Sequence, residues 1–310
     1  MPTQQSPVQV SVVMVTYWTG QVLWQAIDSV LAQPIEFELI LVNNGNPEDV
    51  VKQLELLGET NRSVRLMSGQ GNVGFSRACN LGAEQASGQN LLFLNPDCVL
   101  FPGCLQSVLI SLDKLPSGSL VGGNLLDSEQ RSCANTRREF PTPWRLVVES
   151  LYLYKLAPNH PYFKRLKDTI DESVEVPQLV SVVSGAFMIV ARDSFELLGG
   201  FDEDYFLHVE DVDYCIRHHL SKQPTYFCPA AKAYHFQSSS QVSWYRVELH
   251  KAQSFQTYFQ KHFSDSYPPF FMFVLSLVLY GRFLARSILK VFTFGKLPAA
   301  PDDARRLVDS

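Results

Sequence analysis

The sequence predicts an α/β protein with a mostly parallel central sheet flanked by helices. Four apolar runs without alternation, at residues 10–15, 37–42, 64–67 and 91–94, are typical of buried parallel strands. Amphipathic segments at 22–31 and 48–57, and a glycine-bounded loop and helix at 71–88, separate them. Such βαβ units cover both faces of a sheet and bring the loops after the strands to one edge, where ligands bind in open α/β sheets.

Composition excludes some functions. The 310 residues can bury a sizeable core, as one large domain or two smaller ones. A net charge of -5, from 26 basic and 31 acidic residues, argues against a nucleic-acid-coating surface. Six cysteines without a CxxC pair indicate reduced thiols, and the first residues show no secretory signal, so we expect a cytosolic compartment.

The stretch LLFLNPDC, residues 91–98, ends the fourth predicted strand with a carboxylate. Asp97 follows Asn95 and Pro96 at the carboxyl end of that strand, a position where ligands are commonly bound. A carboxylate beside a diphosphate can hold Mg²⁺ or Mn²⁺. Asn-Pro-Asp is also an ordinary turn sequence, so the stretch alone leaves both interpretations open.

A second acidic stretch, FDEDYFLHVEDVDYCIR, occupies residues 201–217. Its apolar spacing predicts a helix that begins near Glu210, with Glu210, Asp211 and Asp213 in the first turn. The helix macrodipole alone favours acids there by about 0.3 to 1 kcal/mol each. Six carboxylates between residues 202 and 213 exceed what capping requires, and one of them can deprotonate an incoming hydroxyl.

The remaining segments are less regular. We expect strands at 120–123, 180–183, 186–191 and 225–228, and helices at 102–112 and 192–198. Residues 128–175 are polar and proline-punctuated, either an acceptor-facing segment or an insertion without chemistry. His235 lies between two aromatic residues and is either a packed core residue or a metal ligand.

Taken together, these motifs resemble the family 2 glycosyltransferases with the GT-A fold, and most closely the rhamnosyltransferase-like branch that builds bacterial surface polysaccharide. The resemblance runs from Val10 to about Phe236. It rests on VVMVTY at 12–17, VNN at 42–44, NVGF at 72–75 with NLG at 80–82, LNPD at 94–97, SGAF at 184–187, GFDE at 200–203 with Phe206 and the acids at 210, 211 and 213, and His235.

The resemblance implies roles for individual residues. Asp211 matches the family's catalytic base for in-line attack with inversion, through a transition state of oxocarbenium character. Glu210 would orient the acceptor or a metal-bound water, and Asp97 and His235 would hold the metal. Loops after the strands would bind the nucleotide-sugar donor through Thr16, Tyr17, Asn43, Asn44, Asn72, Gly74, Asn80 and Asn95.

Three residues depart from the family pattern. Asn95 replaces the first acid of the DxD motif, so we expect weak or optional dependence on Mg²⁺ or Mn²⁺. Asn43 replaces an acid at the end of strand two; its carbonyl can accept from a pyrimidine N3–H, which leaves uridine and thymidine both open. Trp18 replaces an asparagine and either stacks on a base or packs internally, with packing favoured.

The C-terminal segment is hydrophobic and basic. Its apolar run, residues 270–280, is far shorter than the roughly 20 residues of a spanning helix, so we do not expect it to cross a bilayer. Arg282, Arg286 and Lys290 recur every four residues and predict an amphipathic helix in the membrane interface. A helix packed on the domain or in a dimer is the alternative.

We therefore divide the chain into a catalytic domain at 1–265, with a nucleotide-binding half at about 8–125 and an acceptor half at about 126–265, and a membrane-associating tail at 266–310. The expected activity is inverting transfer of a sugar, with dTDP-rhamnose the leading donor and a UDP- or GDP-sugar the alternative. The expected acceptor is a saccharide or polyprenyl-diphosphate-linked saccharide at the cytoplasmic face of the inner membrane, in cell-surface polysaccharide synthesis.

The same motifs bear on two other classes of protein. A Rossmann oxidoreductase is disfavoured because Thr16 to Gly20 read TYWTG after the first strand, and not GxGxxG. A catalytically silent, membrane-peripheral scaffold remains an alternative, because Asn95 has replaced an acid and fold does not imply function.

Overall fold

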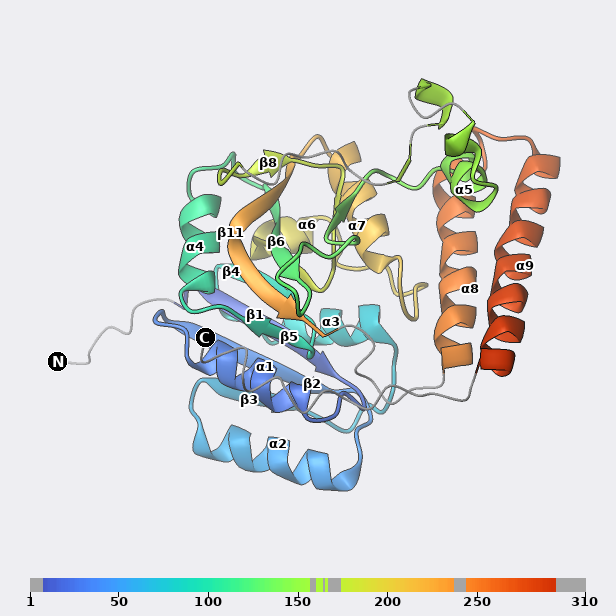
Figure 1. The fold of residues 1–310 in the computed structure, drawn as a ribbon. Coiled ribbons are helices and arrows are strands. Elements are labelled where there is room, and N and C mark those ends of the chain that lie inside the picture. The colour runs from blue at the N-terminus through green and yellow to red at the C-terminus, as the bar shows by residue number, and fades with distance from the viewer. Residues whose placement is uncertain (1–7, 157–159, 164, 167–173, 237–243, 294–310) are drawn as a thin grey trace.

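The computed structural model describes residues 8–156, 160–163, 165–166, 174–236 and 244–293, with side chains described as far as Ile288 (Figure 1). Its first half alternates strands and helices as the sequence predicts. The elements are β1 (Val10–Thr16), α1 (Val22–Leu31), β2 (Phe37–Asn43), α2 (Glu48–Thr60), β3 (Val64–Met67), α3 (Phe75–Glu84) and β4 (Asn90–Leu94).

The second half contains β5 (Cys98–Leu100), α4 (Cys104–Leu112), β6 (Leu120–Leu126), β7 (Arg137–Arg138), α5 (Pro143–Ser150), the 3-10 turns η1 (Leu153–Lys155) and η2 (Pro161–Phe163), β8 (Gln178–Leu179), β9 (Val182–Val183), β10 (Phe187–Ala191), α6 (Arg192–Leu197), α7 (Glu210–Leu220) and β11 (Thr225–His235). Three predicted strands differ, and the first of them, expected at 120–123, continues to Leu126 as β6. The one expected at 180–183 is only the two-residue β9, which lies in the small sheet with β7, and β8 ends before it at Leu179. The one expected to end at Cys228 continues to His235 beyond a register shift.

The main sheet has the order β3-β2-β1-β4-β10-β6-β11-β5, with β8 paired to β11. Strands β1 to β4 are parallel, so their following loops share an edge as predicted. Strand β10 is antiparallel to β4 and pairs Phe187 with Leu94. The turn before β10 is therefore brought next to the loop that follows β4.

Two apolar clusters cover the sheet, and this explains the absence of alternation in the strand sequences. Side chains of α1, α2 and α4 pack on one face, and side chains of α3, α6 and α7 pack on the other. In β1, Val12 and Met14 belong to one cluster while Val13 and Val15 belong to the other. A strand buried on both faces has no position for a polar side chain that lacks a partner.

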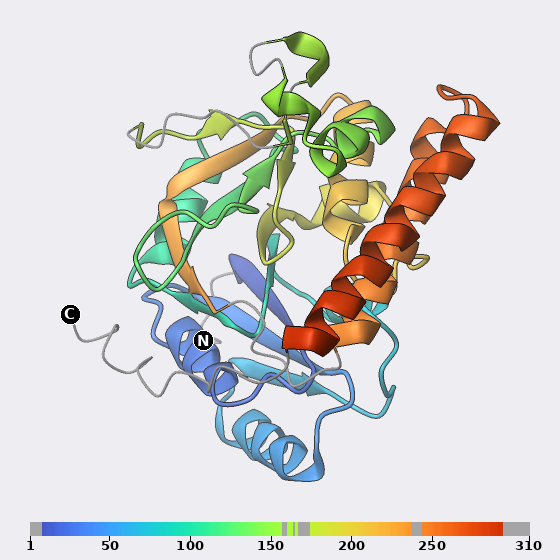
Figure 2. The same cartoon turned by 45° about the vertical axis from the view of Figure 1, so that its right-hand side comes forward.

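Helices α8 (Trp244–Phe263) and α9 (Pro269–Thr293) lie side by side outside the α7 layer (Figures 1 and 2). Leu275 and Leu279 of α9 are buried in the same cluster as Tyr258 and Phe259 of α8. The predicted boundary after residue 265 falls in the turn between these helices, and the functional division of the chain stays a prediction.

Helix α9 is longer than the apolar run expected at 270–280, and the expectation that it does not cross a bilayer stays a prediction. The helix does not stop being apolar at Tyr280, and Pro269–Ile288 is long and apolar enough to cross a bilayer by length and composition alone. Arg282 and Arg286 do not form a free basic stripe, because Arg282 donates to Ser150 of α5 and Arg286 pairs with Glu248 of α8. The Lys290 side chain and residues 294–310 lie outside the described part of the chain.

Candidate active site

The loop after β2 is built by amide side chains. Asn43 Oδ1 accepts hydrogen bonds from the backbone N–H groups of Gly45 and Asn46, at 3.3 and 3.0 Å, and from Asn46 Nδ2 at 2.9 Å. Asn46 Nδ2 also donates to Thr16, which is buried. The oxygen that we expected to bind a pyrimidine N3–H is thus occupied, and in this structure Asn43 and Thr16 shape the loop.

Trp18 does not pack internally, contrary to our expectation. Its side chain is 41% exposed, and its indole Nε1 donates to the carbonyl of Gly45 at 3.1 Å. Its backbone N–H donates to Asn46 Oδ1 at 2.8 Å. Trp18 is therefore fixed across the β2 loop with much of its ring accessible. Tyr17, in the loop after β1, lies beside Gly45 of the β2 loop.

A second pair of asparagines fastens the NVGF loop. Asn44 Nδ2 donates to Asn72 Oδ1 at 3.1 Å, and Asn44 Oδ1 accepts from Val73 N–H at 3.0 Å. Gly74 has a φ of 88°, and a Cβ there would lie 2.8 Å from the carbonyl oxygen of Phe206. Only glycine allows the backbone of the NVGF loop to come this close to Phe206. The contact joins this loop to the acidic stretch before α7.

Asn80 makes a similar bridge to the acidic stretch. Its Nδ2 donates to the carbonyl of Phe201 at 2.8 Å, and its Oδ1 accepts from Phe201 N–H at 2.9 Å. These two bonds use both ends of the amide. The structure thus gives Asn80 a positioning role, whereas we had expected a donor contact.

Asp97 and His235 meet although 138 positions separate them in the sequence (235 minus 97). Strand β11 pairs antiparallel with β5 and sets His235 opposite Cys98, so His235 Nε2 lies 3.4 Å from Asp97 Oδ1. His235 Nδ1 is buried and has no hydrogen-bond partner among the described residues. A carboxylate beside an imidazole with an unpartnered nitrogen suits a divalent cation such as Mn²⁺.

The Cys98 sulfur lies within the same group, whose ligand atoms are all within 4.8 Å of one another. Burial raises the pKa of the Cys98 thiol well above its usual value. A protonated thiol is a poor ligand for a hard cation. Asn95 is at the same turn, where its backbone N–H donates to the carbonyl of Ala186 at 3.0 Å.

Asp211 is held in one orientation at the start of α7. Its Oδ2 accepts from Gly185 N–H at 3.0 Å, its Oδ1 accepts from Val212 N–H at 2.8 Å, and Arg138 donates to both oxygens. A Cβ at Gly185 would lie 3.1 Å from Asp211 Cβ. The SGAF motif therefore fixes the Asp211 carboxylate through Gly185. The next residue, Ala186, accepts the hydrogen bond from Asn95 N–H.

The contacts of Asp211 also limit how an acceptor can approach. Two carboxylate oxygens offer about four lone-pair sites. The two backbone N–H groups and the two contacts to Arg138 use all of them. A hydroxyl group that gives its proton to Asp211 must displace Arg138, the one partner that is a flexible side chain.

Glu210, next to Asp211, is a buried carboxyl group. Its Oε2 has no hydrogen-bond partner among the described residues. Burial and the neighbouring Asp211 raise the pKa of Glu210 to about 8. Before it, His208 and Val209 have φ values of 67° and 73°, and a β-branched residue in that region indicates backbone strain of the kind that clusters at functional sites.

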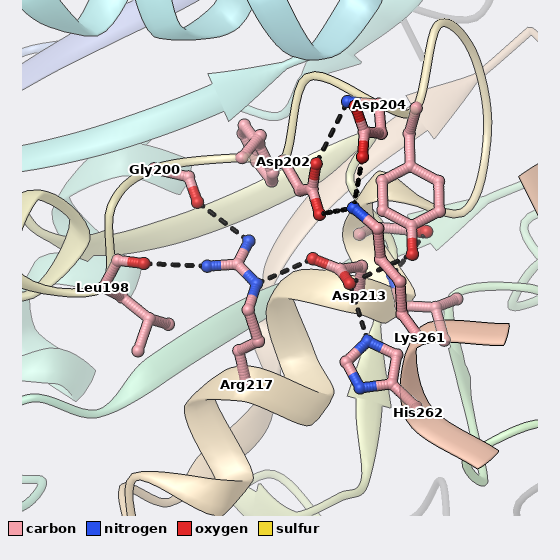
Figure 3. A network of polar contacts seen from close by, with 12 residues as sticks. Leu198, Gly200, Asp202, Asp204, Asp213, Arg217, Lys261 and His262 are labelled. Atoms are coloured by element: carbon pink, nitrogen blue, oxygen red, sulfur yellow. Dashed lines mark hydrogen bonds and ion pairs between the residues drawn. The ribbon is translucent and has the colours of Figure 1, made fainter. Parts of the chain in front are cut away.

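Other acids of the stretch have a structural role (Figure 3). Asp213 accepts from Tyr205 OH at 3.1 Å, Arg217 Nε at 2.7 Å and His262 Nε2 at 2.7 Å. Lys261 of α8 pairs with Asp202 and Asp204. We call this group of seven residues the α7–α8 clasp: Asp202, Asp204, Tyr205, Asp213, Arg217, Lys261 and His262.

Comparison with known proteins agrees with this arrangement. The family model "Glycosyl transferase family 2" matches residues 11–199, and the chain belongs to this family. The chain is 27% identical over 245 residues to an N-acetylglucosaminyl-diphospho-decaprenol L-rhamnosyltransferase from Mycobacterium tuberculosis. The alignment covers 74% of this chain and 76% of the relative. The protein is thus a nucleotide-sugar glycosyltransferase with the GT-A fold.

Two solved structures share the fold. The mannosyltransferase PcManGT from Pyrobaculum calidifontis, in complex with GDP-Man and Mn²⁺, has a TM-score of 0.57 at 16% identity, over 98% of this chain and 84% of that one. GalNAc-T7 with UDP, GalNAc and Mn²⁺ has a TM-score of 0.58 at 13% identity. That match covers 96% of this chain and 60% of the GalNAc-T7 chain.

Arg138 is the site residue that sequence reasoning missed. It lies on the two-residue strand β7 within the 128–175 region, for which the sequence left a role open. Strand β7 pairs with β9 and thereby directs Arg138 to Asp211. A two-residue strand has no detectable periodicity, so no pattern in the sequence could have identified it.

Proposed function

We propose that this glycosyltransferase moves rhamnose from dTDP-rhamnose to a lipid-linked saccharide with inversion at the anomeric carbon. The observation that carries the proposal is the seating of Asp211 beside the turn that contains Asn95 and Asp97. The choice of rhamnose is supported by the M. tuberculosis relative, at 27% identity. Transfer from another UDP- or GDP-sugar is the second candidate.

In this mechanism Asp211 removes the proton from the acceptor hydroxyl. The oxygen then attacks the anomeric carbon as the bond to the diphosphate breaks on the opposite face, so the configuration inverts. The two backbone N–H groups on Asp211 fix its direction, and Arg138 leaves the carboxylate when the acceptor enters. Glu210 presents a buried carboxyl group that suits orientation of the acceptor.

Asp97 and His235 are the residues that would hold a divalent cation. When bound, Mg²⁺ or Mn²⁺ stabilises the negative charge that develops on a departing diphosphate. Because Asn95 supplies no second carboxylate, we propose that metal dependence is weak. On the donor side, the accessible ring of Trp18 offers a stacking surface for the base.

We further propose that the protein lies at the cytoplasmic face of a membrane. The support is the exposed apolar face of α9, formed by Phe270, Phe273, Val274, Leu277, Leu284 and Ile288. A helix that buries one face on its own domain and leaves an apolar face uncovered suits the lipid interface.

A panel of UDP-, GDP- and dTDP-sugars, with and without Mn²⁺, tests the donor by thermal shift. We expect dTDP-rhamnose to stabilise the protein most, and only modestly more with Mn²⁺. The Asp211→Asn variant should bind the same donor yet lose transfer. Full transfer by that variant would reject Asp211 as the base, and a preferred UDP- or GDP-sugar would reject rhamnose.

A further inference from the structure

Helix α8 brings a lysine to the strained loop before Asp211. The His250 ring stacks on Phe206 with centroids 4.6 Å apart, and Ser254 Oγ donates to the carbonyl of Leu207 at 2.9 Å. Lys251 lies between these contacts in the sequence and three positions before Ser254, so it shares their side of the helix. Its half-buried side chain therefore approaches the loop that leads into α7.

Lys251 belongs to a group of cations that we call the cationic cluster. Its members come from three elements that are distant in the sequence: Arg138, Lys251, Arg282 and Arg286. Burial lowers the pKa of Lys251; Glu248 opposes this effect, and the three arginines lower the pKa further. The geometry agrees, because Arg286 contacts Glu248, one turn before Lys251 on α8, and Arg282 lies one turn before Arg286 on α9.

The cluster contains more positive charge than its neighbours neutralise. Arg138 pairs with Asp211 and Arg286 pairs with Glu248. Arg282 donates to the neutral hydroxyl of Ser150, and within the described part of the chain neither Arg282 nor Lys251 forms an ion pair. Half-buried like charges are unfavourable without an anion, and an anion with several acceptor oxygens would relieve the repulsion.

The cluster also connects the candidate base to α9, the helix that carries the exposed apolar face. Arg138 contacts Asp211, and half-buried Arg282 of α9 faces Ser150 of α5, while Leu284 and Ile288 of the same helix are exposed. Ser150, the partner of Arg282, is followed by exposed Leu151 and Tyr152. The elements that carry these cations thus include both the strand that contacts Asp211 and the helix that carries the exposed apolar face.

We propose that the cationic cluster binds the diphosphate of a polyprenyl-diphosphate-linked acceptor, with the prenyl chain along α9 and the sugar toward Asp211. This rests on the proposed transferase function and identifies the residues that would hold the acceptor. Arg138 would then move from Asp211 to the diphosphate, which frees a lone pair on the base. A diphosphate fits better than an isolated phosphate, because it offers more acceptor oxygens to the several cations that β7, α8 and α9 bring to this region.

The test measures binding of farnesyl diphosphate by calorimetry, in EDTA and without donor, so that it does not depend on transfer. The Lys251→Gln/Arg282→Gln variant should bind at least about tenfold more weakly, because it lacks two charge-assisted contacts. Farnesol should bind both proteins equally. Lys52→Gln, on exposed α2, is the matched control and should bind as the wild type does.

Three outcomes would overturn the proposal: no binding of farnesyl diphosphate by the wild type, equal binding by the double variant, or loss of binding in Asp97→Asn, which would place the ligand at the donor site. Vesicles of phosphatidylglycerol and phosphatidylethanolamine distinguish the acceptor from lipid headgroups. The double variant should keep vesicle binding, and a parallel loss would assign the cluster to headgroups. Asp211→Asn should bind farnesyl diphosphate without transfer, so failure of the proposed activity is recognised separately.

Discussion

At the scale of single residues, Glu210 shows how a site residue can lower stability. Its pKa is raised to about 8, so between the usual carboxyl pKa and that value the unfolded chain releases the proton first. The free energy of unfolding therefore decreases as pH rises through this range. Buried carboxyl groups with a strongly raised pKa are typical of functional sites, where their role offsets the loss of stability.

We expect Glu210→Gln to remove this decrease. At about pH 8 the variant should be more stable than the wild type by at least about 1.4 kcal/mol, the free energy that corresponds to one pKa unit, and the difference should shrink toward about pH 5. Urea denaturation at both pH values measures it, and transfer should fall in the same variant. An unchanged pH profile of stability would mean that Glu210 is ionised in the folded protein.

The substitution Gly185→Ala tests whether the position of the Asp211 side chain matters, because it changes no charge. An alanine there puts a Cβ 3.1 Å from Asp211 Cβ, so the carboxylate must shift by a few tenths of an ångström. We expect kcat to fall about tenfold, since catalysis depends on placement of the base, while donor binding is unchanged. Gly281→Ala is the control, because a Cβ there meets nothing within 4 Å. Normal kcat in Gly185→Ala would show that the position of this side chain does not matter.

At the scale of elements, the acidic residues of the α7–α8 clasp hold helix α8 against α7 and the loop before it. Burial alone would raise the pKa of Asp213, but hydrogen bonds from His262 and Arg217 hold it below its usual range. Asp213 therefore stabilises the fold above the usual aspartate pKa, and this contribution is lost as pH falls through the lowered value.

Asp213→Asn should lower the free energy of unfolding at neutral pH by about 3 kcal/mol, because it leaves Arg217 and His262 without their buried partner. The loss should shrink below about pH 4, where the wild type loses the same contribution. Denaturation curves across that range measure it. Asp49→Asn, in the first turn of α2, is the control. If both variants lose the same stability, the clasp has no special role.

The same elements show what a sequence can predict. Strands β1 to β4 were predictable because burial on both faces leaves a continuous apolar run, and the start of α7 was predictable from its apolar spacing. The pairing of His235 with Asp97 depends on the register of β11 with β5, which no local pattern encodes. We predicted that Asn43 and Asn80 bind the donor, but their side chains hold loops in place. An asparagine looks the same in a sequence in either role, so the sequence could not distinguish the two.

At the scale of the whole molecule, α8 and α9 link the candidate active site to a candidate membrane surface. The α7–α8 clasp attaches α8 to α7, which carries the candidate base, and α9 buries Leu275, Leu279 and Phe283 against the rest of the chain. Its opposite face remains apolar and exposed. A rigid attachment of this kind would hold Asp211 at a fixed distance from a lipid surface, and this suits an acceptor that is anchored there.

The membrane proposal can be tested with two charges placed on that face. Leu277 and Leu284 are 58% and 55% exposed, so Leu277→Glu/Leu284→Glu should leave the melting temperature unchanged. Burying a leucine in lipid contributes about 1.5 to 3 kcal/mol, so vesicle binding should fall more than tenfold. Transfer to a short, water-soluble acceptor should persist while transfer to a long-chain acceptor in vesicles declines. Leu56→Glu on α2, 60% exposed, should alter none of these, and undiminished vesicle binding in the double variant would move the membrane contact away from α9.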